Sequence, residues 1–308
     1  MKSFRKFAFF TTIATYLLIF IGGLVRVVGA GLGCPDWPTC FGRWIPPTSI
    51  DQVPPEMAGQ FNITLAWVEY TNRLCGMTVG LLILATAIWA ILKLRPHKKI
   101  LYPAMAAAVL TAIQGYQGAV VVSSLLEPVI ISVHLFLALI IVSLLIYTTA
   151  QAYYLEKKEK LPQNTLPVKL SSYAGILWLA GIVQIVLGTQ IRAALETLAK
   201  EYPDLTALEW LSKVGVINHL HMTLGIFLAA FTIFVTLKIL KHKEQVTSLV
   251  QAAAGVMALM VMVQVFLGLS FMVFATQPVT QVFHLWVASL FIGTVLLIYI
   301  STKRIEKG

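Results

Sequence analysis

Three histidines lie inside hydrophobic segments, where an ionisable side chain is costly. They are His134, His221 and His284. Ionisable residues at membrane depth are functional candidates by default, and paired intramembrane histidines are suited to axial ligation of haem iron. Zinc is a weaker alternative, because no third or fourth cysteine, histidine or carboxylate shares the spacing. The remaining alternative is structural, with each imidazole hydrogen-bonding between helices.

The surroundings of two of these histidines repeat. The stretch 113–118, IQGYQG, precedes His134, and the stretch 263–268, VQVFLG, precedes His284 at the same spacing. The two histidines are 150 residues apart in the chain. This pattern indicates one four-helix unit written twice.

A fourth position completes the repeat but carries a different side chain. Asn72 stands in the second hydrophobic segment where His221 stands in the sixth. The C-terminal copy therefore has a complete pair, His221 and His284, and the N-terminal copy has an incomplete one, Asn72 and His134. His219 is two residues from His221 and would face nearly the opposite side of a helix, so the repeat selects His221 as the ligand.

Composition indicates a polytopic membrane protein. The chain has 308 residues, of which 58% are hydrophobic and only 12% charged. Eight segments are long and apolar enough to span a bilayer. They lie at about 8–30, 66–92, 99–122, 128–153, 172–192, 214–240, 247–275 and 279–301.

We therefore expect an all-α integral membrane fold, with eight transmembrane helices arranged as two four-helix bundles. The predicted halves are 1–160, which contains the outer cysteine loop, and 161–308. Each copy has an even number of spans, so both copies run the same way through the membrane. A pseudo-twofold axis along the membrane normal should relate them.

The distribution of positive charge predicts the orientation. The net charge is +10, and 17 of the 23 lysines and arginines cluster at the two termini and in alternate connections. The positive-inside rule places both termini in the cytoplasm. The basic excess is a topology signal and does not indicate nucleic-acid binding. Outward loops are then expected at about 31–65, 123–127, 193–213 and 276–278, with all four repeat positions toward the outer leaflet.

A carboxylate accompanies the incomplete pair. Glu69 lies one helical turn before Asn72, so the two share a helix face. It also precedes Arg73 by four residues, the favourable order for an ion pair. Two alternatives stay open: a plain salt bridge, or a carboxylate at the rim of the N-terminal pocket that is positioned for proton transfer.

Two cysteines flank a short proline-containing stretch in the first outer loop. Cys34 and Cys40 would face the oxidising side of the membrane, where a disulfide persists. We predict that they are bonded, as a structural staple or as a redox-active pair. Cys75 lies in the second segment and is expected to be a small buried apolar residue.

Six basic residues fall outside the inner clusters, and some of them are candidates to bind carboxylates of a cofactor. Arginine forks onto carboxylates, so haem propionates are suitable partners. Arg26 and Arg192 are the best candidates, because each follows a glycine by four residues at matching segment ends. Arg73 is a further candidate.

These residues resemble the haem A synthase family, membrane enzymes of cytochrome oxidase assembly. The stretch 29–40, GAGLGCPDWPTC, resembles the first outer-loop signature of that family. The stretch 67–73, WVEYTNR, resembles its Glu-x-x-His-Arg motif. His134, His221 and His284 match the other family histidines. The resemblance covers nearly the whole chain.

Two positions depart from the family pattern. Asn72 stands where the family has a histidine, and asparagine is a poor iron ligand. Met222 follows His221 where family members often have arginine. An N-terminal haem would therefore have one protein ligand, His134, or a different coordination.

The resemblance implies an activity. Haem O would be oxidised at the C8 ring methyl to the formyl group of haem A, by successive hydroxylations and loss of water from a gem-diol. A b-type haem held by His221 and His284 would be the resident cofactor, and the N-terminal half would hold the substrate. Glu69, Cys34 and Cys40 would be catalytic. Implied partners are haem O, the haem O synthase that supplies it, membrane lipid, an unidentified electron acceptor and a second copy of the chain, in the cell membrane.

Other functions explain fewer residues. A non-catalytic bis-histidine cytochrome b-type electron carrier accounts for the histidines but not for Glu69 or the cysteine loop. A transporter suits parallel repeats, but the segments lack obvious Gly/Pro-broken centres. A thiol-oxidising enzyme would need a second cysteine pair, which the sequence lacks.

Overall fold

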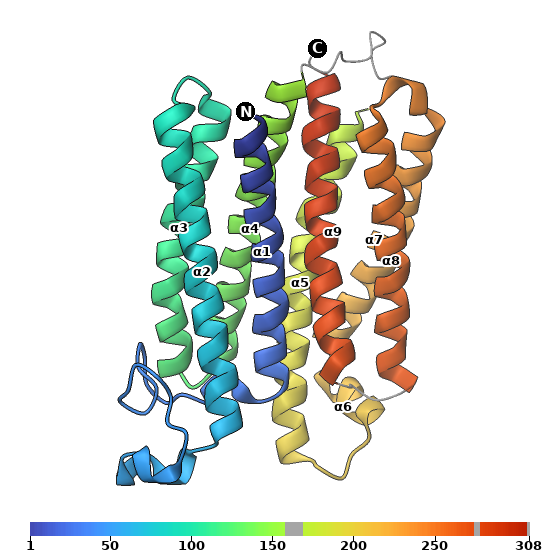
Figure 1. The fold of residues 1–308 in the computed structure, drawn as a ribbon. Helices are drawn as coiled ribbons and strands as arrows, with labels where there is room; N and C mark the ends of the chain where they lie inside the picture. Colours follow the sequence, from blue (N-terminus) through green and yellow to red (C-terminus); the bar gives the residue numbers. More distant parts are fainter. Residues whose placement is uncertain (158–168, 274–277, 307–308) are drawn as a thin grey trace. The chain divides into compact units, whose positions relative to one another are not determined.

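A computed structural model describes residues 1–157, 169–273 and 278–306. In these ranges the regular structure is helical, apart from an isolated bridge between Cys40 and Arg43. Figure 1 shows the order of the helices. They are α1 (Lys2–Val27), α2 (Ile63–Lys93), α3 (Lys98–Ser123), α4 (Pro128–Lys157), α5 (Leu170–Glu201), α6 (Ala207–Val214), α7 (Val216–Lys241), α8 (Ser248–Val273) and α9 (Pro278–Ile305), with short 3-10 turns η1 (Ala30–Leu32), η2 (Ile50–Gln52), η3 (Pro55–Gln60) and η4 (Lys243–Gln245).

Every long helix is apolar enough to cross a membrane. Of the helices described, all except α6 meet this criterion, which gives eight candidate spans and confirms the eight predicted segments. The chain is therefore a multi-pass membrane protein by the length and composition of its helices. Buried hydroxyls along them bond within the helix, as Thr12 does to the Ala8 carbonyl at 2.8 Å and Thr302 to the Ile298 carbonyl at 2.8 Å. Such bonding satisfies polar groups where lipid offers no partner.

The chain divides into two compact units. We call residues 6–145 the N-terminal unit, and residues 1–5 together with the chain from residue 146 onward the C-terminal unit. The boundary predicted at residue 160 lies outside the described residues.

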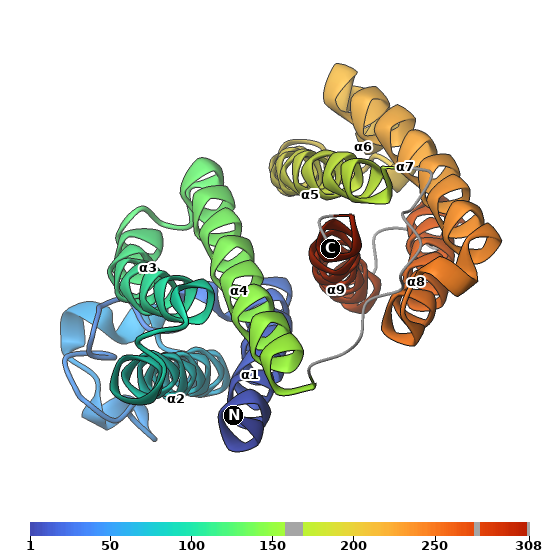
Figure 2. The same ribbon diagram turned by 90° about the horizontal axis from the view of Figure 1, so that it is seen from above.

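Each unit has its own packed interior (Figure 2). In the N-terminal unit, α2, α3 and α4 meet in an apolar cluster of Val79, Ile83, Ala107, Ile141 and Leu145. In the C-terminal unit, α9 packs against α5 and α8, and α5 also packs against α7. The last turns of α4 belong to this unit, where the Tyr154 hydroxyl donates to Ser301 Oγ at 2.6 Å.

The third of the loops predicted to face outward is shorter than expected. The sequence interpretation left residues 193–213 irregular, but α5 continues to Glu201 and α6 occupies Ala207–Val214. The continuation is rich in alanine, leucine, glutamate and lysine, which favour helix, and it ends just before Pro203. A capping box begins α6: Thr206 Oγ1 accepts from the Glu209 amide, and the Glu209 carboxylate accepts from the Thr206 amide. Gly215, at φ 70°, ends it.

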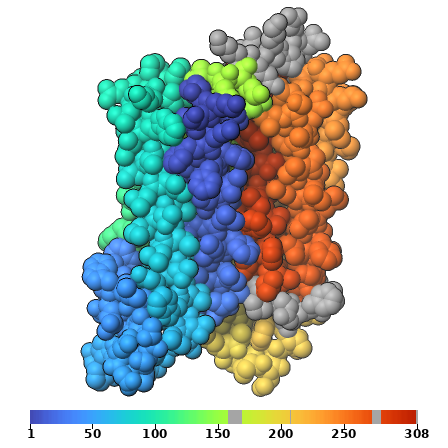
Figure 3. All heavy atoms as spheres, viewed as in Figure 1, coloured from blue at the N-terminus to red at the C-terminus, as the bar shows by residue number. Residues whose placement is uncertain are grey.

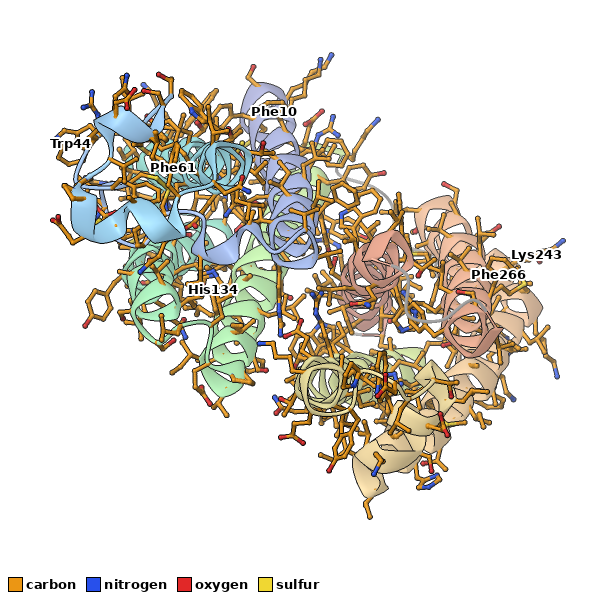
Figure 4. All side chains as sticks on the ribbon, turned by 90° about the horizontal axis from the view of Figure 1, so that it is seen from below. Phe10, Trp44, Phe61, His134, Lys243 and Phe266 are labelled. Carbon is orange, nitrogen blue, oxygen red and sulfur yellow. A yellow bond between two sulfur atoms is a disulfide. The ribbon has the colours of Figure 1, made fainter. Side chains whose placement is uncertain are left out.

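The long loop between α1 and α2 forms a lobe at the N-terminal end of α2, drawn in light blue in Figure 3. Its interior contains Cys34, Cys40, Phe41 and Val53, packed on Ala66 of α2. The rings of Phe41 and Phe61 meet edge to face, with centroids 5.3 Å apart. Trp44 lies at the outer edge of the lobe, 74% exposed (Figure 4). The loop is thus a packed element and not an irregular connection.

Candidate functional site

The three histidines occupy equivalent places on their helices. His134 is the seventh residue of α4, His221 the sixth of α7 and His284 the seventh of α9. Each of these helices carries its lysines at the far end, in the last turn. Asn72 is the tenth residue of α2, which also ends on a lysine. The structure therefore places these four residues toward one end of their helices, as predicted.

None of the three imidazoles acts as a hydrogen-bonding link between helices in the described part of the chain. The Nδ1 atoms of His134, His221 and His284 are buried and have no hydrogen-bond partner. The main-chain carbonyl of Gln184 lies close to the His221 ring, but outside hydrogen-bond geometry. Burying a polar nitrogen without a partner costs free energy, so interhelical bonding does not explain these residues. With Nδ1 enclosed by protein, Nε2 is the ring nitrogen left for a ligand.

His221 and His284 face one another in the C-terminal unit. Their ring centroids are 6.5 Å apart, with the ring planes at 54°. Two imidazoles that bind one metal from opposite sides, with metal–nitrogen bonds of about 2 Å, would have centroids roughly 6 Å apart. Phe271 packs edge to face on His284 at 5.3 Å. The pair therefore fits a single iron with two axial histidines, and α7 and α9 supply one ligand each.

The N-terminal unit supplies one imidazole. Figure 4 shows His134 between the ribbons of α3 and α4. Asn72, on α2, is half-buried and makes no side-chain hydrogen bond with any described residue. The candidate donors are thus one imidazole and one amide, and iron binding by His134 stays a prediction.

The predicted disulfide between Cys34 and Cys40 is present, with the two Cα atoms 4.7 Å apart. Both cysteines are buried in the lobe. Gly33 allows the loop to approach α2, because a Cβ at this position would overlap the main chain of Leu65 and Ala66. Only glycine fits such close contact between backbones. Cys75, the free cysteine of α2, is half-buried.

Glu69 is bound on both carboxylate oxygens. Oε1 accepts from Arg73 Nε at 3.1 Å and from Arg73 Nη2 at 2.5 Å. Oε2 accepts from the Cys34 amide at 2.8 Å. The predicted ion pair is therefore present, and it is largely buried, with the Glu69 side chain 5% exposed. The sequence interpretation did not anticipate that the same carboxylate holds the cysteine loop.

Arg73 extends this contact across the loop. Its Nη1 donates to the carbonyls of Asp36 at 2.9 Å and Thr39 at 2.7 Å, and its Nη2 lies 3.4 Å from the Cys34 carbonyl. The Asp36 carboxylate in turn accepts from the amides of Phe41 and Gly42 and from the Thr39 hydroxyl. Helix α2 and the disulfide loop thus form one hydrogen-bonded assembly.

Sequence reasoning missed the role of Asp36. A signal was readable, because an aspartate among prolines with a threonine three residues later favours a side-chain-capped turn.

The other predicted cofactor contacts lie in different settings. Arg26 is in the last turn of α1 and is half-buried. Arg192 donates from Nε to Glu196 at 2.9 Å, one turn further along α5. The Arg73 guanidinium is directed at the loop. Propionate binding by these arginines stays a prediction. His219 is exposed, which agrees with the choice of His221 as the inward histidine.

The chain is similar in sequence to known proteins. A family model described as cytochrome oxidase assembly protein (COX15-CtaA) matches residues 5–296. A haem A synthase of Wolbachia sp. subsp. Brugia malayi is 26% identical over 314 residues, covering 89% of this chain and 93% of that protein. A haem A synthase of Shewanella oneidensis is 27% identical over 212 residues, covering 67% of this chain and 62% of that protein. A haem A synthase of Shouchella clausii is 27% identical over 219 residues, covering 69% and 67%.

Proposed function

Because the chain belongs to the COX15-CtaA family of cytochrome oxidase assembly proteins, we propose that it is a membrane haem A synthase. Its reaction would convert haem O to haem A, for the assembly of cytochrome oxidase. The observation that carries the proposal is the facing pair His221 and His284, whose Nδ1 atoms are buried without a hydrogen-bond partner and whose ring centroids lie 6.5 Å apart. The names of the related proteins support the same activity.

The C-terminal unit would hold a resident b-type haem. His221 and His284 would be its axial ligands, and Arg192 would be a contact for a propionate. When bound, this haem supplies one-electron transfer. With both histidines holding the iron, this site would serve electron transfer and would not bind a reactant.

The N-terminal unit would hold the substrate. His134 would bind the iron of haem O from one side, and Asn72 on α2 would leave the opposite side without a strong protein ligand. Arg26 and Arg73 are the candidate contacts for propionates. This division into a substrate half and a resident-cofactor half, related by a pseudo-twofold axis, is part of the proposal.

The reaction needs both electron and proton acceptors. Written with water as the oxygen donor, a methyl group and one water give a formyl group, four protons and four electrons. The electrons would leave singly to an external one-electron acceptor. Glu69 is the proposed proton acceptor, since a positioned carboxylate contributes about 10²–10⁴-fold to such transfers. In this role Glu69 would exchange its proton while Arg73 and the Cys34 amide keep it in place.

The cysteine loop would cover this end of α2. Cys34 and Cys40 are buried, and the Cys34 amide donates to Glu69, so the bonded loop would help to hold the carboxylate whether or not the disulfide also accepts electrons. A redox role would add a reversible two-electron change at the sulfurs.

The proposed setting is the cell membrane, with both termini in the cytoplasm. The basic helix ends would face inward and the histidine ends outward. A haem O synthase and a second copy of the chain are the candidate protein partners. Membrane lipid would surround the eight spans.

The deciding experiment is extraction and chromatography of haem from purified protein, with spectra of His221→Ala and His284→Ala. We expect a low-spin b-type haem that both substitutions remove, together with haem A or a hydroxylated intermediate. His219→Ala is the matched control, because this exposed residue lies two positions from His221. Haem B alone, with no oxidised product from added haem O, would favour a non-catalytic electron carrier. A low-spin signal that survives both substitutions would refute the assignment of the ligands.

A further inference from the structure

Each candidate ligand has a glutamine partner on the preceding long helix. Gln114 Nε2 donates to the main-chain carbonyl of His134 at 3.0 Å. Gln184 Nε2 donates to that of His221 at 2.9 Å, and Gln264 Nε2 to that of His284 at 2.7 Å. The glutamine therefore holds the backbone from which the imidazole projects and leaves the ring itself unbound.

A glycine completes each arrangement, four residues after the glutamine on the same helix. A Cβ at Gly118 would lie 3.9 Å from Cε1 of His134. At Gly188 the corresponding distance to His221 is 3.2 Å, and at Gly268 it is 3.7 Å to His284. At Gly188 a Cβ would be in unusually tight contact with the ring, and at Gly118 and Gly268 it would be in ordinary van der Waals contact, so in each case the ring lies against the helix beside the glycine. We call the glutamine, glycine and histidine together a ligand mount.

The glutamines are not placed to satisfy their own polar groups. Oε1 of Gln114 and Oε1 of Gln184 are buried without a hydrogen-bond partner. A buried unpaired acceptor lowers stability, so an amide chosen only to join helices would be expected to satisfy it. This cost is offset if the hydrogen bond that the glutamine donates has another function. Each of these bonds goes to the main chain of a histidine, so that function would be to hold the histidine in place.

We propose that Gln114, Gln184 and Gln264 are positioning residues that set the place of the three axial imidazoles. This inference rests on the proposed haem ligation. Residues that orient metal ligands typically change metal affinity by about 10–100-fold when they are removed. Here the glutamine would orient the ligand through the backbone. The main-chain carbonyl of the histidine has a second lone pair, which accepts a hydrogen bond from the glutamine side-chain amide on the neighbouring helix.

The fourth corner of the repeat, formed by α1 and α2, has neither the glutamine nor the histidine of a ligand mount. Leu18 of α1 stands where Gln184 stands in α5, and it packs against the apolar cluster that contains Val79 and Ile83. Asn72 stands where the mount would have its histidine. The corner thus lacks the ligand and the residue that would position it.

The glycines of that corner remain. Gly22 corresponds to Gly188, and a Cβ at Gly22 would meet no atom within 4 Å. Gly76 corresponds to Gly225, where a Cβ would lie 3.1 Å from Gln184 Nε2, yet a Cβ at Gly76 also meets nothing within 4 Å. The close contacts that a Cβ would make at Gly188 and Gly225 are therefore absent at Gly22 and Gly76.

The first test removes the mount and keeps the ligand. Gln264→Leu and Gln184→Leu should each weaken haem retention about 10-fold or more and convert part of the low-spin spectrum to high-spin. Gln251→Leu is the matched control: it lies on α8 like Gln264 but donates to the carbonyls of Lys243 and Val246, away from the ligands. The control should leave the spectrum unchanged.

Thermal unfolding of haem-free protein separates positioning from simple stabilisation. Should the Gln264→Leu and Gln184→Leu proteins melt earlier but keep haem affinity and a fully low-spin spectrum, the inference is overturned and the proposed haem site stands. If the His221→Ala protein has the same spectrum as the unsubstituted protein, His221 is not a ligand and both proposals are wrong.

The second test rebuilds the missing mount. Asn72→His alone should give the substrate haem a mixed-spin spectrum, because the new imidazole is not positioned. Leu18→Gln together with Asn72→His should raise the low-spin fraction. The reverse change, Gln184→Leu with His221→Asn, should leave the C-terminal haem with one protein ligand. Equal low-spin fractions in the single and double N-terminal variants would contradict a positioning role for residue 18.

Discussion

Arg73 donates two hydrogen bonds to the same oxygen of Glu69, Oε1, and thereby leaves Oε2 for the Cys34 amide. The arginine and the amide approach the carboxylate from different elements, helix α2 and the disulfide loop. The ion pair is therefore also the attachment of the loop. A helical i,i+4 pair at an exposed surface contributes only a few tenths of a kcal/mol, but this one is largely buried and connects two elements.

Glu69→Gln tests whether the carboxylate acts chemically. The change keeps the size of the side chain but removes its charge. We expect haem A formation to fall at least about 100-fold, because the proposed base is lost, while the C-terminal haem spectrum is unchanged. Loss of one partner from a buried pair should also destabilise the loop by about 3 kcal/mol. Turnover assays with added haem O and optical spectra measure both effects.

The matched control for that substitution is Glu156→Gln. Glu156 pairs with Arg5 at 2.8 Å and is also partly buried, but it lies at the basic end of α4. It should lower stability without changing haem A formation. If Glu69→Gln protein turns over haem O at the unmodified rate, Glu69 is a structural clamp only.

Arg73→Lys tests the attachment of the loop. Lysine keeps the charge but cannot reach the Glu69 carboxylate and the carbonyls of Asp36 and Thr39 together. The expected cost is about 1–3 kcal/mol for the groups left unpaired. Hydrogen exchange at the amides of residues 34–42 should become faster. Arg43→Lys, in the same loop, is the control and should leave exchange unchanged; equal acceleration in both variants would contradict the contacts of Arg73.

The disulfide predicts a specific pattern of alkylation. In protein denatured without reductant, one cysteine, Cys75, should react, and all three should react after reduction. Closing a loop of this length should stabilise the fold by about 2 kcal/mol. Mass spectrometry gives the count directly. Three reactive thiols in protein prepared without reductant would show that Cys34 and Cys40 are not bonded in the membrane.

The start of α6 should depend on pH. Hydrogen bonds from the Thr206 amide and hydroxyl lower the pKa of Glu209 below the ordinary value of 4.5. A carboxyl with a lowered pKa stabilises the fold above its unfolded pKa, and the contribution is lost as the pH falls below about 4.5. Exchange of the α6 amides should therefore accelerate in that range. Glu209→Gln should abolish the pH dependence; an unchanged profile would refute the cap.

The membrane spans could be predicted because the signal is long and local. Runs of twenty or more apolar residues admit few other structures, and the two copies confirm each other. The helical continuation to Glu201 and the cap at Thr206 have ordinary local signals, but an outward loop was expected there. The disulfide was also predictable, since the cysteines are close in sequence and lie in a loop that the charge distribution assigns to the oxidising side.

The loop contacts could not be predicted in the same way. The bond from the Cys34 amide to Glu69 joins residues 35 apart in sequence and depends on how closely Gly33 approaches α2. The glutamines were visible in the repeated stretches before His134 and His284. Their proposed positioning role could not be predicted, because the glutamine side chain donates to a main-chain carbonyl, a group that every residue has.

The burial of Cys34 and Cys40 has a kinetic consequence. Their side chains are 0% and 1% exposed, so a thiol reagent in solution reaches the sulfurs after the loop has opened. When opening and closing are fast, the observed rate of reduction is the intrinsic rate multiplied by the open fraction. Each 1.4 kcal/mol in the contacts of Glu69 and Arg73 then changes that rate about tenfold. Two side chains of α2 thus control how quickly a reductant in solution can react with this disulfide.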